Sequence, residues 1–490
     1  MTVTARLLGR VRSSRLLSNS SVYLAGTLVN RLFPFFLTPL YTRIMPSHDF
    51  GTWGFCMTVL NALLVIADLG IGGATTRLYW DYAAREEINT FLTVCFLTRI
   101  SVATCVSVAL FWPLMASWDW LSSGGIPVVP FVPLLLACAA AQAIVAFNLE
   151  VARASHKPWH FSIIQISETI LQSVASAALV LFGWGAVGPL AGYLAGAILT
   201  AIVAGIWFVS RHGTLSGLHW GITWESLRYG IGTLPTSAST WLRRMADRIM
   251  VGRSISMSGL AIYQLAASGM APLTILMGSF NSTYLPYYYE QRKRGERHLP
   301  KLVAIDMLII AGLAGISVAT VALLPELIHI LAPPSYAPAM QLAPYFVLIA
   351  FYGGMTLQFT KELMFLKRPE LAGLVSIVPS LLGVAANVIV IPRFGTMGAT
   401  IVGTIVSISI LAGSIIVTRR IENSGHNLVR LSAACAAVTL FALIFAGLHF
   451  AAFDPVSLLM RLAATLVCMG CIVLVLGMTH AWRTAAGGAL

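Results

Sequence analysis

Charged side chains are scarce in this sequence of 490 residues. Asp, Glu, Lys and Arg together make up 10% of it, whereas a soluble domain carries about a quarter. Hydrophobic residues account for 58% and the mean hydropathy is +0.83, which is more apolar surface than water-surrounded cores can hide. The composition therefore excludes a soluble globular protein. It predicts an all-α membrane protein, since a bilayer accepts about 20 apolar residues per helical crossing.

The sequence also lacks the motifs of common enzyme classes. It contains no P-loop, no His-Glu-x-x-His and no catalytic-triad signature, so we expect no enzyme, no catalytic residue, no cofactor and no metal. Its seven cysteines all lie in apolar stretches, and the Cys468-x-x-Cys471 pair has no nearby His or acidic ligand. Small packing residues explain these cysteines better than zinc or redox chemistry does.

Acidic residues are fewer than basic ones, 18 against 31, which gives a formal net charge of +13. In a soluble protein this excess would suggest nucleic acid as a partner. In a membrane protein it is typical of cytoplasmic loops and of contact with lipid headgroups. We therefore expect anionic lipids as partners and no nucleic acid.

Apolar runs of helical length recur along the chain and predict about 14 transmembrane helices. The first six spans are residues 20–42, 51–71, 91–117, 129–150, 159–182 and 187–209. The next six are residues 227–252, 258–283, 302–324, 338–360, 371–391 and 396–418, and the last two are 429–451 and 457–479. The predicted organisation is a basic N-terminal segment (1–19), an N-lobe (20–209), a linker (210–226), a C-lobe (227–418) and a trailing helix pair (429–479).

Basic residues test this arrangement independently. With the N-terminus in the cytoplasm, 22 of the 31 Lys and Arg residues lie in cytoplasmic segments or near cytoplasmic span ends, four lie in outer segments or near outer span ends, and the remaining five lie inside spans. Membrane proteins concentrate Lys and Arg in cytoplasmic loops, and shifting the spans by one helix would invert this distribution. We therefore predict that both termini and the 1–19 and 210–226 segments are cytoplasmic.

An internal repeat links the two sets of six spans. The matches are residues 23–28 with 229–234, 43–45 with 248–250, and 50–55 with 258–263, at offsets of 206, 205 and 208. Six spans separate the copies, and because six is even the copies have the same orientation. This predicts two six-helix lobes with pseudo-twofold symmetry along the membrane normal.

The opening stretch carries a family resemblance in a group of residues. They are Gly26, Asn30-Arg31, Pro39-x-Tyr41-x-Arg43, Phe50-Gly51 and Ala67-Asp68-x-Gly70, preceded by the basic tail. This pattern resembles the polysaccharide-transport proteins, the oligosaccharide flippases of the multidrug/oligosaccharidyl-lipid/polysaccharide (MOP) superfamily. The resemblance implies an inner-membrane carrier that moves undecaprenyl-diphosphate-linked oligosaccharide from the cytoplasmic to the periplasmic leaflet. A polysaccharide polymerase is a further candidate partner.

Ionisable residues within the spans are the candidate functional site. Inserting one at the centre of a membrane helix costs about 2.5–3.5 kcal/mol, and residues kept at such a cost usually serve a function. Arg31 lies in the middle of the first span. Arg243, Arg244, Asp247 and Arg248 share one arc of the seventh span, where Asp247 is within reach of Arg243 or Arg244. One carboxylate does not neutralise three guanidinium groups, so a diphosphate is the expected counter-ion. An outer-interface cluster that contacts headgroups is the alternative.

Two further charged residues have open interpretations. Glu168 shares a helix face with Gln165 and Gln172, which indicates either a site for sugar hydroxyls or a coupling proton, or an interhelical hydrogen bond. Arg99 either lines the cavity or extends to the cytoplasmic interface. Asp68 is expected to pair with Arg77.

These observations predict an alternating-access flippase with a cationic central cavity. A multidrug exporter of the same fold is one alternative, but arginines would repel organic cations. A membrane glycosyltransferase or polymerase is another, although it would need a carboxylate base or a long soluble loop. A structural scaffold is disfavoured by the charges in the spans.

Overall fold

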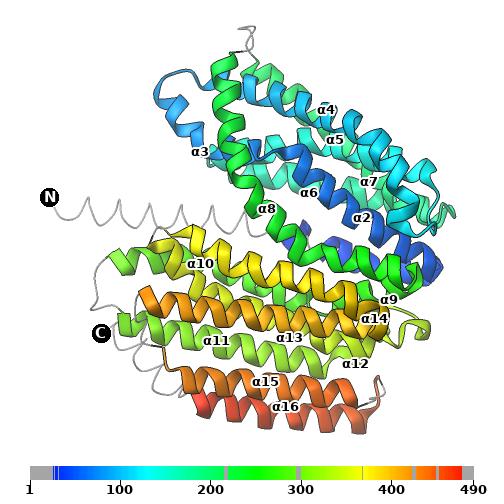
Figure 1. Ribbon diagram of the computed structural model, residues 1–490, viewed down its shortest axis with the longest axis vertical. Helices are drawn as coiled ribbons and strands as arrows, with labels where there is room; N and C mark the ends of the chain where they lie inside the picture. The colour runs from blue at the N-terminus through cyan, green and yellow to red at the C-terminus, as the bar shows by residue number, and fades with distance from the viewer. Residues whose placement is uncertain are drawn as a thin grey trace. The chain divides into compact units, whose positions relative to one another are not determined.

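The computed structural model describes residues 26–476, apart from residues 27, 31, 214–218, 294–298, 367, 422–425 and 449–451. Within these ranges the regular structure is entirely helical, which confirms the predicted all-α class. The chain divides into two compact units, Met1–Ser258 and Gly259–Leu490 (Figure 1).

Unit 1 contains seven labelled helices, and residues 32–44 are also helical. They are α2 (Ser47–Asp68), α3 (Ile71–Ala84), α4 (Ile88–Ser122), α5 (Val128–Ala154), α6 (Pro158–Leu181), α7 (Val187–His212) and α8 (Trp220–Ser254). The short helix α3 was not predicted, because its 14 residues are too few to cross a bilayer. Phe91, Phe96, Phe147 and Phe208 form part of the apolar core between α4, α5 and α7.

Glycines bring α6 and α7 into close contact. A Cβ added at Gly192 would lie 2.2 Å from the backbone nitrogen of Ser176, and one at Gly196 would lie 2.5 Å from the backbone nitrogen of Gln172. Small residues spaced by four are the usual way for membrane helices to approach each other this closely. The two helices therefore pack backbone against backbone.

Helix α8 belongs to unit 1 by its contacts. It packs against α2, α3 and α4, and a Cβ at Gly230 would lie 2.4 Å from the carbonyl oxygen of Leu69. The boundary between the compact units therefore follows α8, after the predicted linker at 210–226. The predicted duplication of residues 20–209 in 227–418 stays a prediction.

Unit 2 contains the remaining helices. They are α9 (Met257–Ser268), α10 (Ala271–Lys293), α11 (Leu299–Ala322), α12 (Leu324–Leu331), the 3-10 helix η2 (Pro334–Tyr336), α13 (Ala339–Phe365), α14 (Pro369–Ile421), α15 (Leu428–Gly447) and α16 (Pro455–Leu476). Helix α13 is central and contacts α10, α11, α12, α14 and α15. Helices α15 and α16 lie side by side at the edge of unit 2 (Figure 1).

Ten helices in the described ranges are long and apolar enough to cross a membrane, or eleven if the bent pair α9 and α10 forms one span. Helix α14 counts once among them, yet a straight helix of its 53 residues would measure about 80 Å. Gly395 interrupts it with φ 62° and ψ −150°, a conformation that essentially only glycine adopts. The chain is therefore a multi-pass membrane protein, and the number 14 stays a prediction.

Candidate functional site

Three charged side chains meet inside unit 1. Arg99 of α4 is 4% exposed, and its Nη2 lies 2.8 Å from Oδ1 of Asp68 at the end of α2. Its Nη1 donates a hydrogen bond of 2.5 Å to Oε2 of Glu150 on α5. Arg99 Nε is buried and has no hydrogen-bond partner among the described residues. Two carboxylates surround one guanidinium, so Arg99 is fully compensated from within the protein.

This arrangement corrects one expectation from the sequence. Arg77 pairs with Asp81 at 3.0 Å on the exposed face of α3, so the predicted Asp68–Arg77 pair is wrong. Because α3 begins three residues after Asp68, the backbone N–H of Gly72 donates to Asp68 Oδ1 at 3.3 Å. Glu150 was missed by sequence reasoning, although its position at the end of the fourth predicted span was a usable signal.

Glu168 is buried near the middle of α6 among neutral partners. Its Oε1 accepts hydrogen bonds from Nε2 of Gln142 on α5 at 2.7 Å and from Nε2 of Gln172 at 3.1 Å. Tyr193 of α7 lies close to the carboxylate. The hydrogen-bonded interhelical contact that the sequence left open is therefore present. Across the described residues, no ion pair to Glu168 is recorded.

Most side chains of the predicted arginine cluster lie outside the residues that the structure describes. Arg31 is outside the described residues, as are the side chains of Arg243 and Arg244. Arg248 on α8 is 8% exposed and its Nη1 contacts the sulfur of Met245 at 3.4 Å. Asp247 accepts the backbone N–H of Arg248 at 2.9 Å. A substrate role for these residues stays a prediction.

Unit 2 contains a second buried charge network, which the sequence did not predict. Asp306 of α11 is 1% exposed and accepts hydrogen bonds from Nζ of Lys361 on α13 and, at 2.8 Å, from the hydroxyl of Tyr284 on α10. Its Oδ2 lies 3.1 Å from Nε2 of His426. Lys361 Nζ also donates to Oε1 of Gln358 at 2.8 Å. Asp306 lies inside the ninth predicted span, and this was the available sequence signal.

Glu362, the neighbour of Lys361, holds a second ion pair in this network. It accepts hydrogen bonds from Arg292 and from the hydroxyl of Tyr288, both on α10. The guanidinium of Arg292 also lies over the ring of Phe365, 5.0 Å from its centre. Arg292 and Lys361 are among the residues at predicted cytoplasmic positions, just beyond the spans 258–283 and 338–360, yet their side chains join α10, α11 and α13.

The two networks have exchanged charges on helices that the predicted repeat would pair. Helices α4 and α5 match the third and fourth predicted spans of the first set, and α11 and α13 match those of the second set. The pair is Arg99 with Glu150 in unit 1 and Asp306 with Lys361 in unit 2. The basic residue of the pair is thus on α4 in unit 1 and on α13 in unit 2, so the polarity of the two ion pairs is opposite.

Comparison with known proteins identifies the family. Residues 16–291 match the family model described as polysaccharide biosynthesis protein. Two curated relatives come from Haemophilus influenzae. The "Lsg locus putative protein 1" is 22% identical over 60% of this chain and 72% of its own length. An "uncharacterized membrane protein" is 20% identical over 59% of this chain and 68% of its own length.

Solved structures share the fold. The lipid II flippase MurJ in an inward closed conformation superimposes with a TM-score of 0.66, at 13% identity, over 92% of this chain and 97% of MurJ. An inward-facing multidrug resistance MATE transporter of the MOP superfamily gives 0.59, at 15% identity, over 82% and 98%. The fold is thus the one found in MOP transporters. Because the family model covers more than half of the sequence, the chain belongs to the polysaccharide biosynthesis protein family.

Proposed function

We propose that this protein translocates polyprenyl-diphosphate-linked oligosaccharide across the bacterial inner membrane, from the cytoplasmic to the periplasmic leaflet. The glycan would serve the synthesis of O-antigen, exopolysaccharide or capsule. The observation that carries the proposal is the family match over residues 16–291, and the fold shared with a lipid II flippase supports it. The cytoplasmic excess of Lys and Arg supports an orientation with both termini inside.

The cationic part of the proposal concerns the diphosphate. Arg31, Arg243 and Arg244 would bind the phosphate oxygens, because a guanidinium matches them in a two-pronged geometry. Arg248 would support this charge from a buried position, whereas Arg99, a further candidate from the sequence, is compensated by Asp68 and Glu150. The polyprenyl chain remains in apolar surroundings while the two units alternate access. No covalent step is involved, so the protein acts as a carrier and not as an enzyme.

The test is surface polysaccharide in a flippase-deficient strain that expresses each variant at equal level. Arg31→Ala and Arg243→Ala should abolish export. Arg31→Lys should retain only part of it, because the ammonium group of Lys is a point charge and lacks the planar, two-pronged geometry of the guanidinium group. Arg77→Ala is the matched control, since its exposed pair with Asp81 contributes about 0–1 kcal/mol. Wild-type export by both alanine variants would contradict the cationic site. Resistance to organic cations without export would favour a multidrug exporter.

Glu168 and Asp247 are the proposed ion-coupling or polar-cavity residues. Support for Glu168 comes from its burial beside two amides, since a carboxylate in the membrane that has only neutral partners is stabilised by taking up a cation or a proton. Glu168→Gln should abolish transport while leaving membrane insertion intact. Full export by this variant would show that the residue serves packing only.

A further inference from the structure

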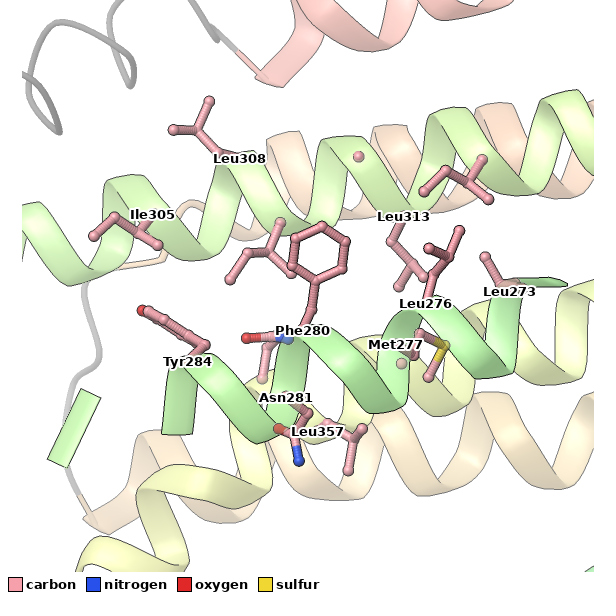
Figure 2. Close-up of a pocket in the computed structure, with 15 residues that line it drawn as sticks. Leu273, Leu276, Met277, Phe280, Asn281, Tyr284, Ile305, Leu308, Leu313 and Leu357 are labelled. Carbon is pink, nitrogen blue, oxygen red and sulfur yellow. The ribbon is translucent and has the colours of Figure 1, made fainter. Parts of the chain in front are cut away.

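Basic side chains gather in unit 1 where α6 begins and α7 ends. This place differs from the cavity of about 250 Å³ between α10, α11 and α13, whose wall is mainly apolar and includes Leu276 and Phe280 of α10 (Figure 2). Residue 157 directly precedes α6, and residues 211 and 212 end α7. The α6–α7 basic cluster consists of Lys157, His160, Arg211 and His212.

Aromatic contacts hold this cluster in place. The ring of His160 packs on that of Trp207, with 3.9 Å between the two ring centres. The guanidinium group of Arg211 lies over the same indole ring, 5.6 Å from its centre. His212 is fixed by a hydrogen bond of 2.8 Å that its Nδ1 donates to Oδ1 of Asn89 on α4. Because Trp207 positions Arg211, binding of an anion there costs less side-chain entropy than at a freely moving arginine.

The two cations of the cluster have no carboxylate partner in the part of the chain that the structure describes. Lys157 and Arg211 are the cationic groups close to both histidine rings, and neither forms an ion pair among the described residues. By contrast, Arg99 and Arg292 each pair with a buried or partly buried carboxylate. The α6–α7 basic cluster therefore presents net positive charge that an anion from outside the chain can neutralise.

The lengths of α6 and α7 place the cluster at the surface of a bilayer. The two helices have 24 and 26 residues, so they measure about 36 and 39 Å. A hydrocarbon core is about 30 Å thick, and a bilayer with its headgroup layers is about 40–45 Å thick. Trp159, next to Lys157, is exposed, as is typical of an aromatic residue at this interface. Lys157 and Arg211 therefore lie at the level of the lipid headgroups.

Exposed apolar side chains continue from the cluster into the membrane. Ile163 lies about one and a half turns beyond Lys157 on α6, and Ile206 lies about one and a half turns before Arg211 on α7. Both isoleucines are exposed. A ligand bound here meets cations at one end and an apolar helix surface next to it, and this combination fits an amphiphile better than a free phosphate ion.

We propose that the α6–α7 basic cluster binds the phosphate of an anionic phospholipid, with phosphatidylglycerol as the simplest case, in the predicted cytoplasmic leaflet. Lys157 and Arg211 contact the phosphate oxygens, and the acyl chains lie along α6 and α7. A lipid with net negative charge is selected, because the ammonium group of phosphatidylethanolamine already neutralises its own phosphate. The inference goes beyond the proposed function and does not depend on which substrate the protein carries.

Three double variants separate charge at the cluster from charge elsewhere. Lys157→Gln with Arg211→Gln removes two positive charges from the cluster. Arg228→Gln with Arg430→Gln is the matched control, since it removes the same charge from exposed residues at other predicted cytoplasmic positions. Lys157→Arg with Arg211→Lys keeps the charge and changes both side chains.

The experiment is a titration of the purified full chain with phosphatidylglycerol, followed by native mass spectrometry, which gives the affinity for the first bound lipid. A basic side chain near an anionic lipid contributes about a fivefold gain in affinity. The variant without the two cluster charges should therefore bind at least about tenfold more weakly than the wild type. The matched control and the charge-keeping variant should stay within about threefold of the wild type.

Four results would overturn the proposal. The first is equal affinity of the wild type and the Lys157→Gln, Arg211→Gln variant, and the second is an equal loss in the matched control. The third is equal binding of phosphatidylethanolamine, which would show that net lipid charge is not recognised. The fourth is displacement of phosphatidylglycerol by an equal concentration of glycerol 3-phosphate, which would show a site for a soluble phosphate.

Discussion

Gly72 of α3 faces the carboxylate of Glu150 on α5 so closely that a Cβ on Gly72 would lie 2.1 Å from Glu150 Oε1. Glu150 is in turn held by Arg99. The absence of a side chain at position 72 is therefore what leaves room for the buried ion pair between α4 and α5.

Gly72→Ala should push the Glu150 carboxylate away from Arg99. We expect a loss of about 1–3 kcal/mol in the free energy of unfolding, the usual cost of overpacking. The measurement is thermal unfolding in detergent of Gly72→Ala, Glu150→Ala and the double variant. Glu150→Ala removes the carboxylate that the new Cβ would meet. Gly72→Ala should therefore cost less in the Glu150→Ala variant than in the wild type. Strictly additive effects would show that Gly72 and Glu150 are independent.

The glycines of α7 provide a second prediction. Gly192→Ala places a Cβ against the backbone of Ser176, which cannot move as a side chain can, so it should destabilise the protein by about 1–3 kcal/mol. Gly205→Ala on the same helix is the control, since its Cβ would meet Ile144 at an ordinary 3.7 Å. Thermal unfolding compares the two variants, and equal melting temperatures would contradict the close packing of α6 on α7.

The buried pair of Asp306 and Lys361 should behave asymmetrically. Asp306→Asn removes the charge that pairs with Lys361, which is 4% exposed. Removing one partner of a buried ion pair lowers the free energy of unfolding by about 3–5 kcal/mol. Asp306→Asn combined with Lys361→Met should recover a large part of this loss. Yield and melting temperature of the purified variants measure the effect. A double variant less stable than Asp306→Asn alone would contradict the pairing.

Glu326 of α12 gives a pH-dependent prediction. It receives two hydrogen bonds from Arg461 of α16, at 2.8 and 2.6 Å. Burial acts to raise the pKa of Glu326, but the bonds from Arg461 and from the backbone N–H of Phe453 outweigh it, so the pKa lies below its ordinary value of 4.5. A lowered pKa stabilises the fold above the ordinary value, and this stability is lost as the pH falls through the lowered pKa.

The stability difference between the wild type and Glu326→Gln should therefore be full near pH 7 and shrink below about pH 4.5. Thermal unfolding across this range measures it. Glu370→Gln is the control, because Glu370 is exposed and no ion pair to it is recorded among the described residues. A difference that does not change with pH would show that Glu326 acts through packing alone.

Much of the fold was predictable from hydropathy, because a membrane span must be long and apolar whatever it packs against. Helices α4 to α7 and α15 begin within a few residues of their predicted starts. Helices α3 and α12 were not predictable in this way, since 14 and 8 residues do not make a span.

The ion pairs were less predictable than the helices. Asp68 had Arg77 nearby in sequence, yet Arg99 is its partner because α2 packs against α4. Lys361 and Arg292 were assigned to loops from their positions near the span ends. Arg461 is one of the four residues predicted at outer positions, yet it is 1% exposed and pairs with Glu326. Which charge meets which depends on helix packing, which a single sequence does not encode locally.

The kink of α14 at Gly395 has a practical consequence for mapping the protein in a membrane. The two arms of α14 are joined through a single non-helical residue, Gly395, and no loop long enough to accept an inserted tag separates them. A reporter placed there would have to open the helix, and its signal would describe a damaged protein. Accessibility experiments on this part of unit 2 therefore need single cysteines on the flanking turns, not insertions at the corner.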